Sequence, residues 1–255
     1  MNSALAADSV TVVGGARELV TDLSLEFHAG EFVAVLGRNG SGKTLTLHTL
    51  AGLRPPARGA VRLNGSDISQ LGRREIAQQL GILLQDPEES FTSTVLQAVL
   101  IGRHPHLKLW QWEGSEDERI ALDALAQMGL AEMADRSTAT LSGGEQRRLA
   151  IATLLAQQPR VFLLDEPTNH LDPHHQLAVL TLFRELARKG ATVIATLHDP
   201  TLAARFADRA VLLFDHGRWR AGPAADILNA EALSELYLSR IMEIHADGRR
   251  IFISA

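Results

Sequence analysis

The chain has 255 residues, of which 45% are hydrophobic and 22% charged, and this balance is that of a globular protein with a sizeable core. A formal net charge of −5 without any Lys/Arg block argues against nucleic acid or an anionic membrane surface as the main electrostatic partner. The absence of cysteine excludes disulfides, thiolate metal sites and thiol catalysis. The N-terminus lacks signal-peptide features, and no apolar run reaches the roughly 18 residues of a membrane span.

Alternating segments near the N-terminus predict antiparallel strands. They read VTVVGG and ELVTDLSLEFHAG, followed later by GAVRLNG, and they turn at Gly and at Asn-Gly. Apolar runs of strand length then recur between helical stretches, at 32–36, 81–84, 161–165, 191–197 and 210–214. This alternation indicates an α/β fold with a mostly parallel sheet, beside which the N-terminal strands form an antiparallel β sub-domain.

The strand pattern disappears between Gln85 and Pro159. The segments TVLQAVLIG, ERIALDALAQMGL and GGEQRRLAIATLLAQ have helical spacing instead. We therefore expect a single domain with a helical sub-domain inserted into its core. The expected division is a core of 1–85 and 160–215, a helical sub-domain of 86–159, and a peripheral segment of 216–255 that holds short strands and the helix AEALSELYL.

One short stretch carries a phosphate-binding pattern. GRNGSGKT follows the strand FVAVL, precedes the helix KTLTLHTLAGL and satisfies G-x-x-x-x-G-K-[ST]. Its glycines let backbone N–H groups curl around phosphate oxygens at a helix N-terminus. Lys43 is expected to reach the β and γ phosphates, and the Thr44 hydroxyl to bind Mg²⁺. The candidate nucleotide contacts are Gly37, Arg38, Asn39, Gly40, Ser41, Gly42, Lys43, Thr44 and, within the helix, Thr46.

The strand VFLLD ends in two acidic residues, Asp165 and Glu166. An acidic pair at a strand end is usually solvated surface, but here a parallel strand would carry it to the phosphate site. A carboxylate at that position can hold Mg²⁺, and its neighbour can orient or deprotonate an attacking water. We predict that Asp165 holds the metal and that Glu166 handles the water.

A third stretch, Leu141 to Glu145, reads LSGGE and runs into a long predicted helix. Ser-Gly-Gly at a helix start is a second anion site, because free N–H groups, a hydroxyl and the positive end of the helix dipole meet there. With GRNGSGKT before it and VFLLDEPTNHLD after it, the stretch resembles the ATP-binding subunits of ABC transporters over nearly the whole chain. The resemblance implies a P-loop NTPase core that binds ATP and Mg²⁺ and hydrolyses ATP.

The resemblance also implies a head-to-tail homodimer, in which each ATP lies between the P-loop of one chain and the LSGGE of the other. Asp172, in the string NHLD, matches a residue set against the opposite P-loop. The residues implied to contact nucleotide bound by the partner chain are Ser142, Gly143, Gly144, Glu145 and Asp172.

Two further positions match residues of the family that act in hydrolysis. Gln85 matches the glutamine that reaches Mg²⁺ and the water site and links the core to the helical sub-domain. His198, after the strand ATVIATL, matches the histidine that contacts the γ-phosphate. The implied catalytic residues are Lys43, Gln85, Glu166 and His198, and the implied Mg²⁺ ligands are Thr44, Gln85 and Asp165.

The sequence departs from the family at the adenine site. These subunits usually carry an aromatic residue near the turn after the first strand, and counting back from the P-loop leads to Gly14 and its neighbours, which have no ring. A ring contact contributes about 0.5–1.5 kcal/mol beyond its area, so its loss would weaken nucleotide binding or base preference. Arg38 stands where proline is common in the family. We expect that it could compensate for the missing ring by contacting ribose or adenine.

The string IGRHPH at 101–106 resembles the subunits that power bacterial import of cobalamin, ferric siderophores or haem. It implies two copies of this chain under a dimer of a multi-span permease, at the cytoplasmic face of the cell membrane, with an extracytoplasmic binding protein as an indirect partner and no nucleic acid. Alternatives are an exporter ATPase, a P-loop kinase or other soluble NTPase, and an ABC-type ATPase acting on DNA or ribosomes. A kinase does not explain LSGGE, and the stretch between Gln85 and Leu141 lacks the heptads of repair types.

The segment HPHLKLWQWEG holds two tryptophans, Trp110 and Trp112, in a stretch that is neither a clean strand nor a clean helix. They either fill gaps in the helical sub-domain or form an exposed anchor for a helix of the permease. The histidines near them, and those at 170, 174 and 175, lack an acidic or thiolate set, so no zinc site is expected.

Overall fold

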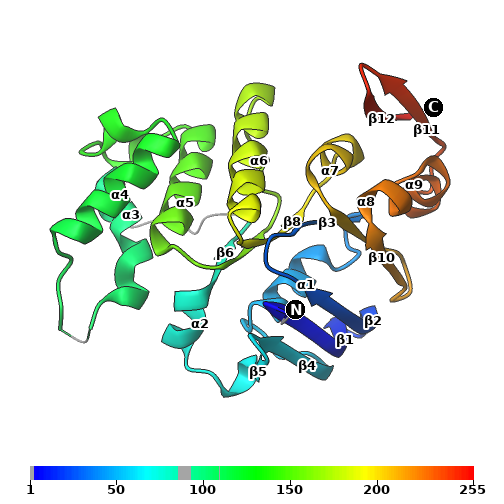
Figure 1. Cartoon of the computed structure of the whole chain (residues 1–255), viewed down its shortest axis with the longest axis horizontal. Helices are drawn as coiled ribbons and strands as arrows, with labels where there is room; N and C mark the ends of the chain where they lie inside the picture. Colours follow the sequence, from blue (N-terminus) through cyan, green and yellow to red (C-terminus); the bar gives the residue numbers. More distant parts are fainter. Residues whose placement is uncertain (1–2, 86–92, 109) are drawn as a thin grey trace.

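The computed structural model describes residues 3–85, 93–108 and 110–255, and its centre is a six-stranded sheet in the order β10-β9-β3-β8-β7-β6 (Figure 1). Neighbours from β9 to β6 are parallel, and β10 is an antiparallel edge strand. All five predicted apolar runs form the parallel strands. The strands are β3 (Phe32–Gly37), β6 (Leu80–Leu83), β7 (Val161–Leu164), β8 (Thr192–Thr196), β9 (Arg209–Leu213) and β10 (Trp219–Pro223).

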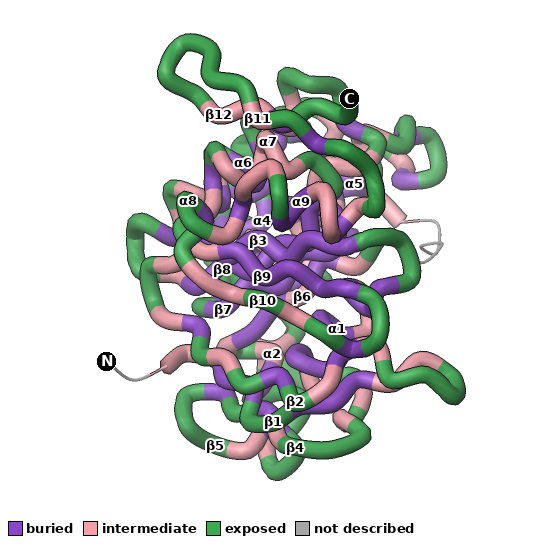
Figure 2. Tube along the Cα trace, turned by 90° about the vertical axis from the view of Figure 1, so that its right-hand side faces the viewer, coloured by how far each residue is buried: buried purple, intermediate pink, exposed green. Residues whose placement is uncertain are grey.

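The apolar runs have little alternation because both faces of the central sheet are covered. In β3, Val33 and Val35 belong to one hydrophobic cluster, whereas Phe32, Ala34 and Leu36 belong to the other. Figure 2 shows the central strands as the buried interior of the molecule. A strand with two buried faces needs apolar side chains at every position, which gives the continuous runs seen in the sequence.

The N-terminal strands form a separate four-stranded antiparallel sheet in the order β2-β1-β4-β5, as predicted. Helix α1 (Lys43–Leu50) contributes Leu47 and Leu50 to the hydrophobic cluster between this sheet and the central one. The helix that follows the phosphate loop is therefore packed from both sides. The strands of this sheet are β1 (Leu5–Gly14), β2 (Arg17–Phe27), β4 (Arg58–Leu63) and β5 (Ser66–Asp67).

The short helices η1 (Ile68–Gln70) and α2 (Arg73–Gln79) precede β6, and a helical insert follows it. The three predicted helices are present, although the first is shorter than expected because IGRHPH forms a 3-10 helix, and β6 ends two residues before Gln85. Helices α3, α4 and α5 pack on one another. The insert comprises α3 (Val95–Leu100), η2 (Ile101–His106), α4 (Ser115–Gln127), η3 (Ala131–Met133), η4 (Thr138–Thr140) and α5 (Gly143–Gln157). Its boundaries at 86 and 159 stay a prediction.

The C-terminal elements lie at the opposite end of the long axis from the helical insert (Figure 1). The predicted helix is present as α9, and a β-hairpin follows it. Within the described part of the chain, no helix is long and apolar enough to cross a membrane. The remaining elements are α6 (Pro173–Arg188), α7 (Pro200–Phe206), α8 (Ala224–Ile227), α9 (Ala230–Tyr237), β11 (Ile241–Ala246) and β12 (Arg249–Ser254).

Candidate functional site

The loop between β3 and α1 is shaped by its glycines. Gly40 and Gly42 have φ angles of +81° and +98°, which residues with a Cβ rarely adopt. A Cβ on Gly37 would lie 2.4 Å from the Ser41 Oγ and 2.8 Å from the carbonyl oxygen of Leu213. Among the described side chains none caps the start of α1. The loop therefore presents backbone N–H groups at a helix N-terminus, which is a phosphate-binding geometry.

Lys43 is a buried cation at this loop. Its Nζ donates to the carbonyl oxygens of Gly37 at 2.8 Å and Arg38 at 3.3 Å. Burial lowers the pKa of Lys43, and the negative charges of Glu166 and Asp165 oppose that shift. The carbonyl oxygens hold the ammonium group in the position where phosphate oxygens can replace them as acceptors.

The end of β7 carries two buried carboxylates, with Asp165 0% and Glu166 6% exposed. Thr196, at the end of the neighbouring strand β8, donates from Oγ1 to the Asp165 Oδ1 at 2.7 Å and accepts from the Glu166 backbone N–H at 2.8 Å. The other oxygen, Asp165 Oδ2, is buried and has no hydrogen-bond partner among the described residues. An unpaired buried carboxylate oxygen is costly, and a cation is the ligand that compensates it.

Glu166 is contacted from two loops. The Nε2 of His198 lies 2.5 Å from the Glu166 Oε1, and the Asn169 amide donates to its Oε2. Glu166 has a φ of +49°, a left-handed conformation that is uncommon outside glycine. The structure thus brings together the acid and the histidine that the sequence predicted, and adds Asn169 as a partner of the acid.

The predicted residues divide into two groups in space. One group surrounds a cavity of about 360 Å³ whose lining includes P-loop residues with Gln85, Glu166 and His198. Thr46 is buried one turn along α1 and, within the described chain, does not line it. The lining residues are Leu19, Asn39, Gly40, Gly42, Lys43, Thr44, Leu45, Gln85, Glu166 and His198.

The second group lies outside this cavity in the described chain. Ser142 caps α5: its Oγ accepts from the Glu145 N–H at 3.3 Å, and the Glu145 carboxylate accepts from the Ser142 N–H at 2.7 Å. These bonds hold the pKa of Glu145 below its usual value. A Cβ on Gly144 would lie 3.3 Å from the carbonyl oxygen of His170, so the start of α5 lies against the loop before Asp172. Asp172 caps α6 by accepting from the His175 N–H at 2.9 Å.

A buried arginine that the sequence analysis missed connects the two groups. Arg147, in α5, is 2% exposed. Its guanidinium donates to the carbonyl oxygens of Leu84 at 2.5 Å, Gln85 at 3.2 Å, Asp165 at 2.5 Å and Glu166 at 2.7 Å. A charged residue in the helical pattern of 143–157 reads as a solvent-facing position, and only the tertiary packing turns it inward.

The two tryptophans are not core residues. Trp110 is 91% and Trp112 86% exposed, so of the two alternatives the filling of gaps in the helical insert is excluded, and the exposed anchor stays a prediction. Trp110 has a φ of +66°, which sets it in a left-handed turn.

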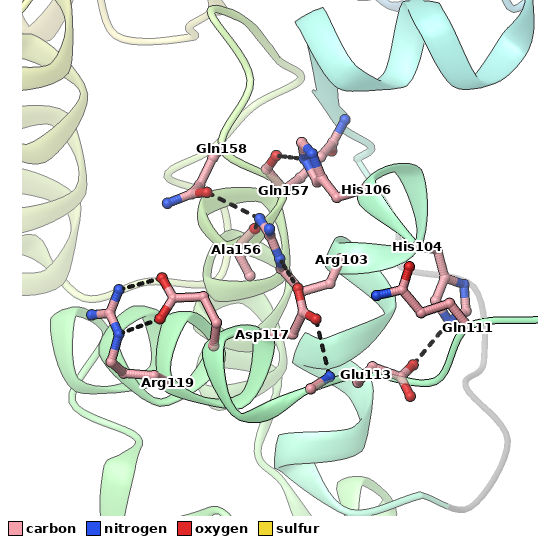
Figure 3. A network of polar contacts seen from close by, with 12 residues as sticks. Arg103, His104, His106, Gln111, Glu113, Asp117, Arg119, Ala156, Gln157 and Gln158 are labelled. Atoms are coloured by element: carbon pink, nitrogen blue, oxygen red, sulfur yellow. Dashed lines mark hydrogen bonds and ion pairs between the residues drawn. The ribbon is translucent and has the colours of Figure 1, made fainter. Parts of the chain in front are cut away.

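A polar network braces the tryptophan segment at its base (Figure 3). Arg103, which is nearly buried, donates to the Asp117 Oδ1 at 2.9 Å and to the carbonyl oxygen of Ala156 at 2.8 Å. This bond holds the pKa of Asp117 below its usual value, and the other Asp117 oxygen accepts from the Gly114 N–H at 3.1 Å. His104 adds a contact of 3.5 Å to Glu113. The motif IGRHPH therefore fixes both ends of the exposed segment.

A family model described as ABC transporter matches residues 20–169, which include the P-loop, LSGGE and the buried acidic pair. This chain belongs to the ABC transporter family. ATP binding is thus an established property of its fold, and the ABC ATPase fold has the antiparallel sheet, central parallel sheet and helical insert seen here.

Relatives of this ABC ATPase match over most of their length. The ferric enterobactin transport ATP-binding protein FepC of Escherichia coli is 37% identical over 241 residues, covering 94% of this chain and 89% of the relative. The hemin import ATP-binding protein HmuV of Gloeobacter violaceus is 42% identical over 218 residues, covering 83% of this chain and 78% of the relative.

Solved structures of ABC transporter proteins have the same fold as this chain. A metal-chelate type ABC transporter in an inward-facing conformation has a TM-score of 0.86 at 28% identity and covers 100% of this chain and 98% of its own. A dimeric bacterial ABC transporter cassette has a TM-score of 0.78 at 28% identity, covering 86% of this chain and 98% of its own.

Near Gly14, where the sequence lacks the expected aromatic residue, an aliphatic side chain lines the cavity. A Cβ on Gly14 would lie 2.6 Å from the Leu19 Cδ1, and Leu19 lines the cavity. Arg38 is ion-paired with Asp215 at 3.0 Å, and its expected contact with ribose or adenine stays a prediction. The Leu19 side chain is therefore the nearest apolar group to the Cβ position of Gly14.

Replacing Arg147 tests whether it holds the site together. We expect Arg147→Ala to lower the free energy of unfolding by about 3 kcal/mol or more, because buried carbonyl oxygens lose their donors. Urea denaturation measures this. The control Arg119→Ala removes an arginine that has only exposed ion pairs in α4 and is expected to cost less than about 1 kcal/mol. Equal losses in the two variants would contradict the structural role of Arg147.

Introducing an aromatic ring at Gly14 tests whether its absence weakens ATP binding. We expect Gly14→Tyr to tighten the Kd for ATP about two- to tenfold, since a ring contact contributes about 0.5–1.5 kcal/mol once the tip of Leu19 moves aside. Isothermal titration calorimetry gives the Kd. Gly14→Leu displaces Leu19 in the same way without adding a ring, and a similar gain in that variant would refute stacking as the cause.

Proposed function

We propose that this chain is the ATP-hydrolysing subunit of a bacterial importer for a metal chelate of the siderophore, haem or cobalamin class. The cavity where Lys43, Glu166 and His198 meet carries the assignment of hydrolysis. The substrate class is supported by relatives that match over most of their length and are described as transporting ferric enterobactin or hemin. A metal-chelate type transporter that covers the whole chain supports it further.

The donor set of the cavity fits Mg²⁺. The buried Asp165 Oδ2 has no hydrogen-bond partner among the described residues and is adjacent in sequence to the lining residue Glu166, and the Thr44 hydroxyl and Gln85 amide of the lining supply the neutral oxygens that this metal accepts. Bound Mg²⁺ supplies neutralisation of the negative charge on the β and γ phosphates. Thr196 keeps Asp165 in place through its 2.7 Å bond to Oδ1, leaving Oδ2 for the metal.

Lys43, Glu166 and His198 divide the chemistry of hydrolysis. The P-loop N–H groups and the Lys43 ammonium bind and orient the phosphates. Glu166 accepts a proton from the attacking water, so that the water oxygen bonds to the γ-phosphorus as the bond to the β–γ bridging oxygen breaks. His198, 2.5 Å from Glu166, is placed to hold that carboxylate and to contact the γ-phosphate. The left-handed backbone of Glu166 is a strained conformation of the kind found at active sites.

A second copy of the chain completes the site in this proposal. Ser142 and Gly143 are exposed at the start of a 15-residue helix, which leaves its anion-binding end accessible to a partner chain. The dimeric cassette among the solved relatives supports a homodimer in which LSGGE and Asp172 face the partner's P-loop. Two open half-sites on one chain become two closed sites in such a pair.

The same proposal gives the two exposed tryptophans a partner. Trp110 and Trp112 have large apolar surfaces that water covers in the isolated chain, and Arg103 and Asp117 keep their segment rigid. Rigid exposed aromatics are typical anchors of protein interfaces. We assign them to contact with a dimer of a multi-span permease at the cytoplasmic face of the membrane. The extracytoplasmic binding protein then acts on the permease and not on this chain, and nucleic acid is not a partner.

Glu166→Gln tests the hydrolytic role. The amide cannot accept the proton, so we expect turnover to fall at least 100-fold while the Kd for ATP stays within about threefold. Phosphate release and calorimetric titration measure the two quantities. Glu132→Gln, an exposed position in η3, should leave both unchanged. Wild-type turnover in Glu166→Gln would exclude Glu166 as the base.

Alanine replacements of Trp110 and Trp112 test the permease contact. Because both side chains are exposed, we expect the doubly substituted subunit to keep its melting temperature and basal ATPase activity but to lose stimulation by the reconstituted permease. Trp219→Ala is the matched comparison: its indole N–H donates to the Thr21 carbonyl oxygen at 3.1 Å, and its loss should lower the melting temperature. Full stimulation in the double variant would remove these residues from the interface.

A further inference from the structure

The C-terminal segment, expected to be peripheral, packs directly behind the His198 loop. Helix α7 begins two residues after His198, and strand β12 packs against it. The Thr201 Oγ1 in α7 accepts from the Phe252 backbone N–H in β12 at 3.1 Å. Phe252 and Ile241 of the hairpin are each 8% exposed and join the main hydrophobic core. The hairpin is therefore a fixed support for α7.

Tyr237 connects the same segment to the His198 loop itself. It is the only tyrosine of the chain and the last residue of α9, and its hydroxyl donates to the carbonyl oxygen of His198 at 3.4 Å. Burial, with a smaller contribution from the negative charge of Asp199, raises the pKa of Tyr237 to about 12. The hydroxyl consequently remains a protonated donor throughout the physiological pH range.

Each residue at the start of α7 is thus held by a different neighbour. The His198 main chain is bound by Tyr237, the Asp199 Oδ1 accepts from the Thr201 N–H at 2.7 Å, and the Thr201 hydroxyl is bound by Phe252. The His198 imidazole projects in turn to Glu166, 2.5 Å away. A half-exposed histidine on a loop needs such anchoring, because loops are otherwise the mobile parts of a fold.

We propose that Tyr237 is a positioning residue for ATP hydrolysis, which holds the His198 backbone so that its imidazole stays on Glu166 and reaches the γ-phosphate. The inference rests on the proposed function of His198. Tyr237 is not itself among the residues that line the cavity in the described chain, and its bond to the lining residue His198 is the route by which it acts. A displacement of about 1 Å in a catalytic group can lower a rate by up to about 100-fold, so a single anchoring bond has a measurable effect.

The variant Tyr237→Phe removes the hydroxyl and keeps the ring. We expect kcat for ATP hydrolysis by the full chain to fall three- to tenfold, with KM within twofold of wild type and an unchanged melting temperature. Arg249→Ala, an exposed hairpin residue, should leave all three at wild-type values. A wild-type kcat in Tyr237→Phe, or a fall that is matched by loss of melting temperature, would overturn the inference.

A double variant separates positioning through His198 from any independent effect. In a His198→Ala background, single-turnover hydrolysis with enzyme in excess should show no further loss on adding Tyr237→Phe. The same three- to tenfold loss in both backgrounds would show that Tyr237 acts elsewhere and would overturn the inference. If the wild-type chain hydrolyses no ATP, the proposed function fails, and that outcome is distinct from a wild-type chain that is active and insensitive to Tyr237→Phe.

Discussion

The site depends on one buried arginine. Arg147 brings a positive charge from α5 into the interior, where the carbonyl oxygens of Gln85, Asp165 and Glu166 and of the neighbouring Leu84 surround it. Burying a guanidinium is costly unless its N–H groups are satisfied, and here each bond also fixes a functional segment. Because α5 begins at the exposed Ser142, the helical insert cannot rotate relative to the acidic pair without disturbing these bonds. Arg147 therefore fixes the orientation of the helical insert relative to the acidic pair in this conformation.

The cavity brings one buried cation close to two buried carboxylates. Burial lowers the pKa of Lys43, the negative charges of Glu166 and Asp165 oppose that shift, and each carboxylate is in turn held by a neighbour. In the proposed site, phosphate oxygens would add negative charge next to Lys43, and Mg²⁺ would add positive charge next to the unpaired oxygen of Asp165. Each would compensate a different charge, which favours their binding as a pair.

Local patterns predicted the parts of the fold that local chemistry determines. GRNGSGKT could be placed because its glycines are required by the turn itself, and the buried strands because two covered faces leave a continuous apolar run. Thr196, Asn169, Arg147 and Tyr237 could not be placed, since each owes its role to a neighbour brought close by strand order or by helix packing. The only sign of Thr196 in the sequence was a polar residue near the end of the apolar run 191–197. The sequence also left open whether the tryptophans are core or exposed, because a large apolar side chain is buried only where the fold provides a packing partner.

The exposed tryptophan segment is costly for the isolated chain. Trp110 adopts a left-handed backbone that disfavours side chains with a Cβ, and both indoles are left in water, so neither gains from burial. The chain nonetheless invests a nearly buried ion pair, Arg103 with Asp117, in keeping the segment fixed. In the proposed contact with a permease, a preformed aromatic anchor would bind with less loss of conformational entropy than a flexible one. The helical insert and the C-terminal support of His198 lie at opposite ends of the molecule (Figure 1). The proposed permease contact and the support of His198 are thus far apart, and the bonds of Arg147 are a direct link between the insert and the acidic pair.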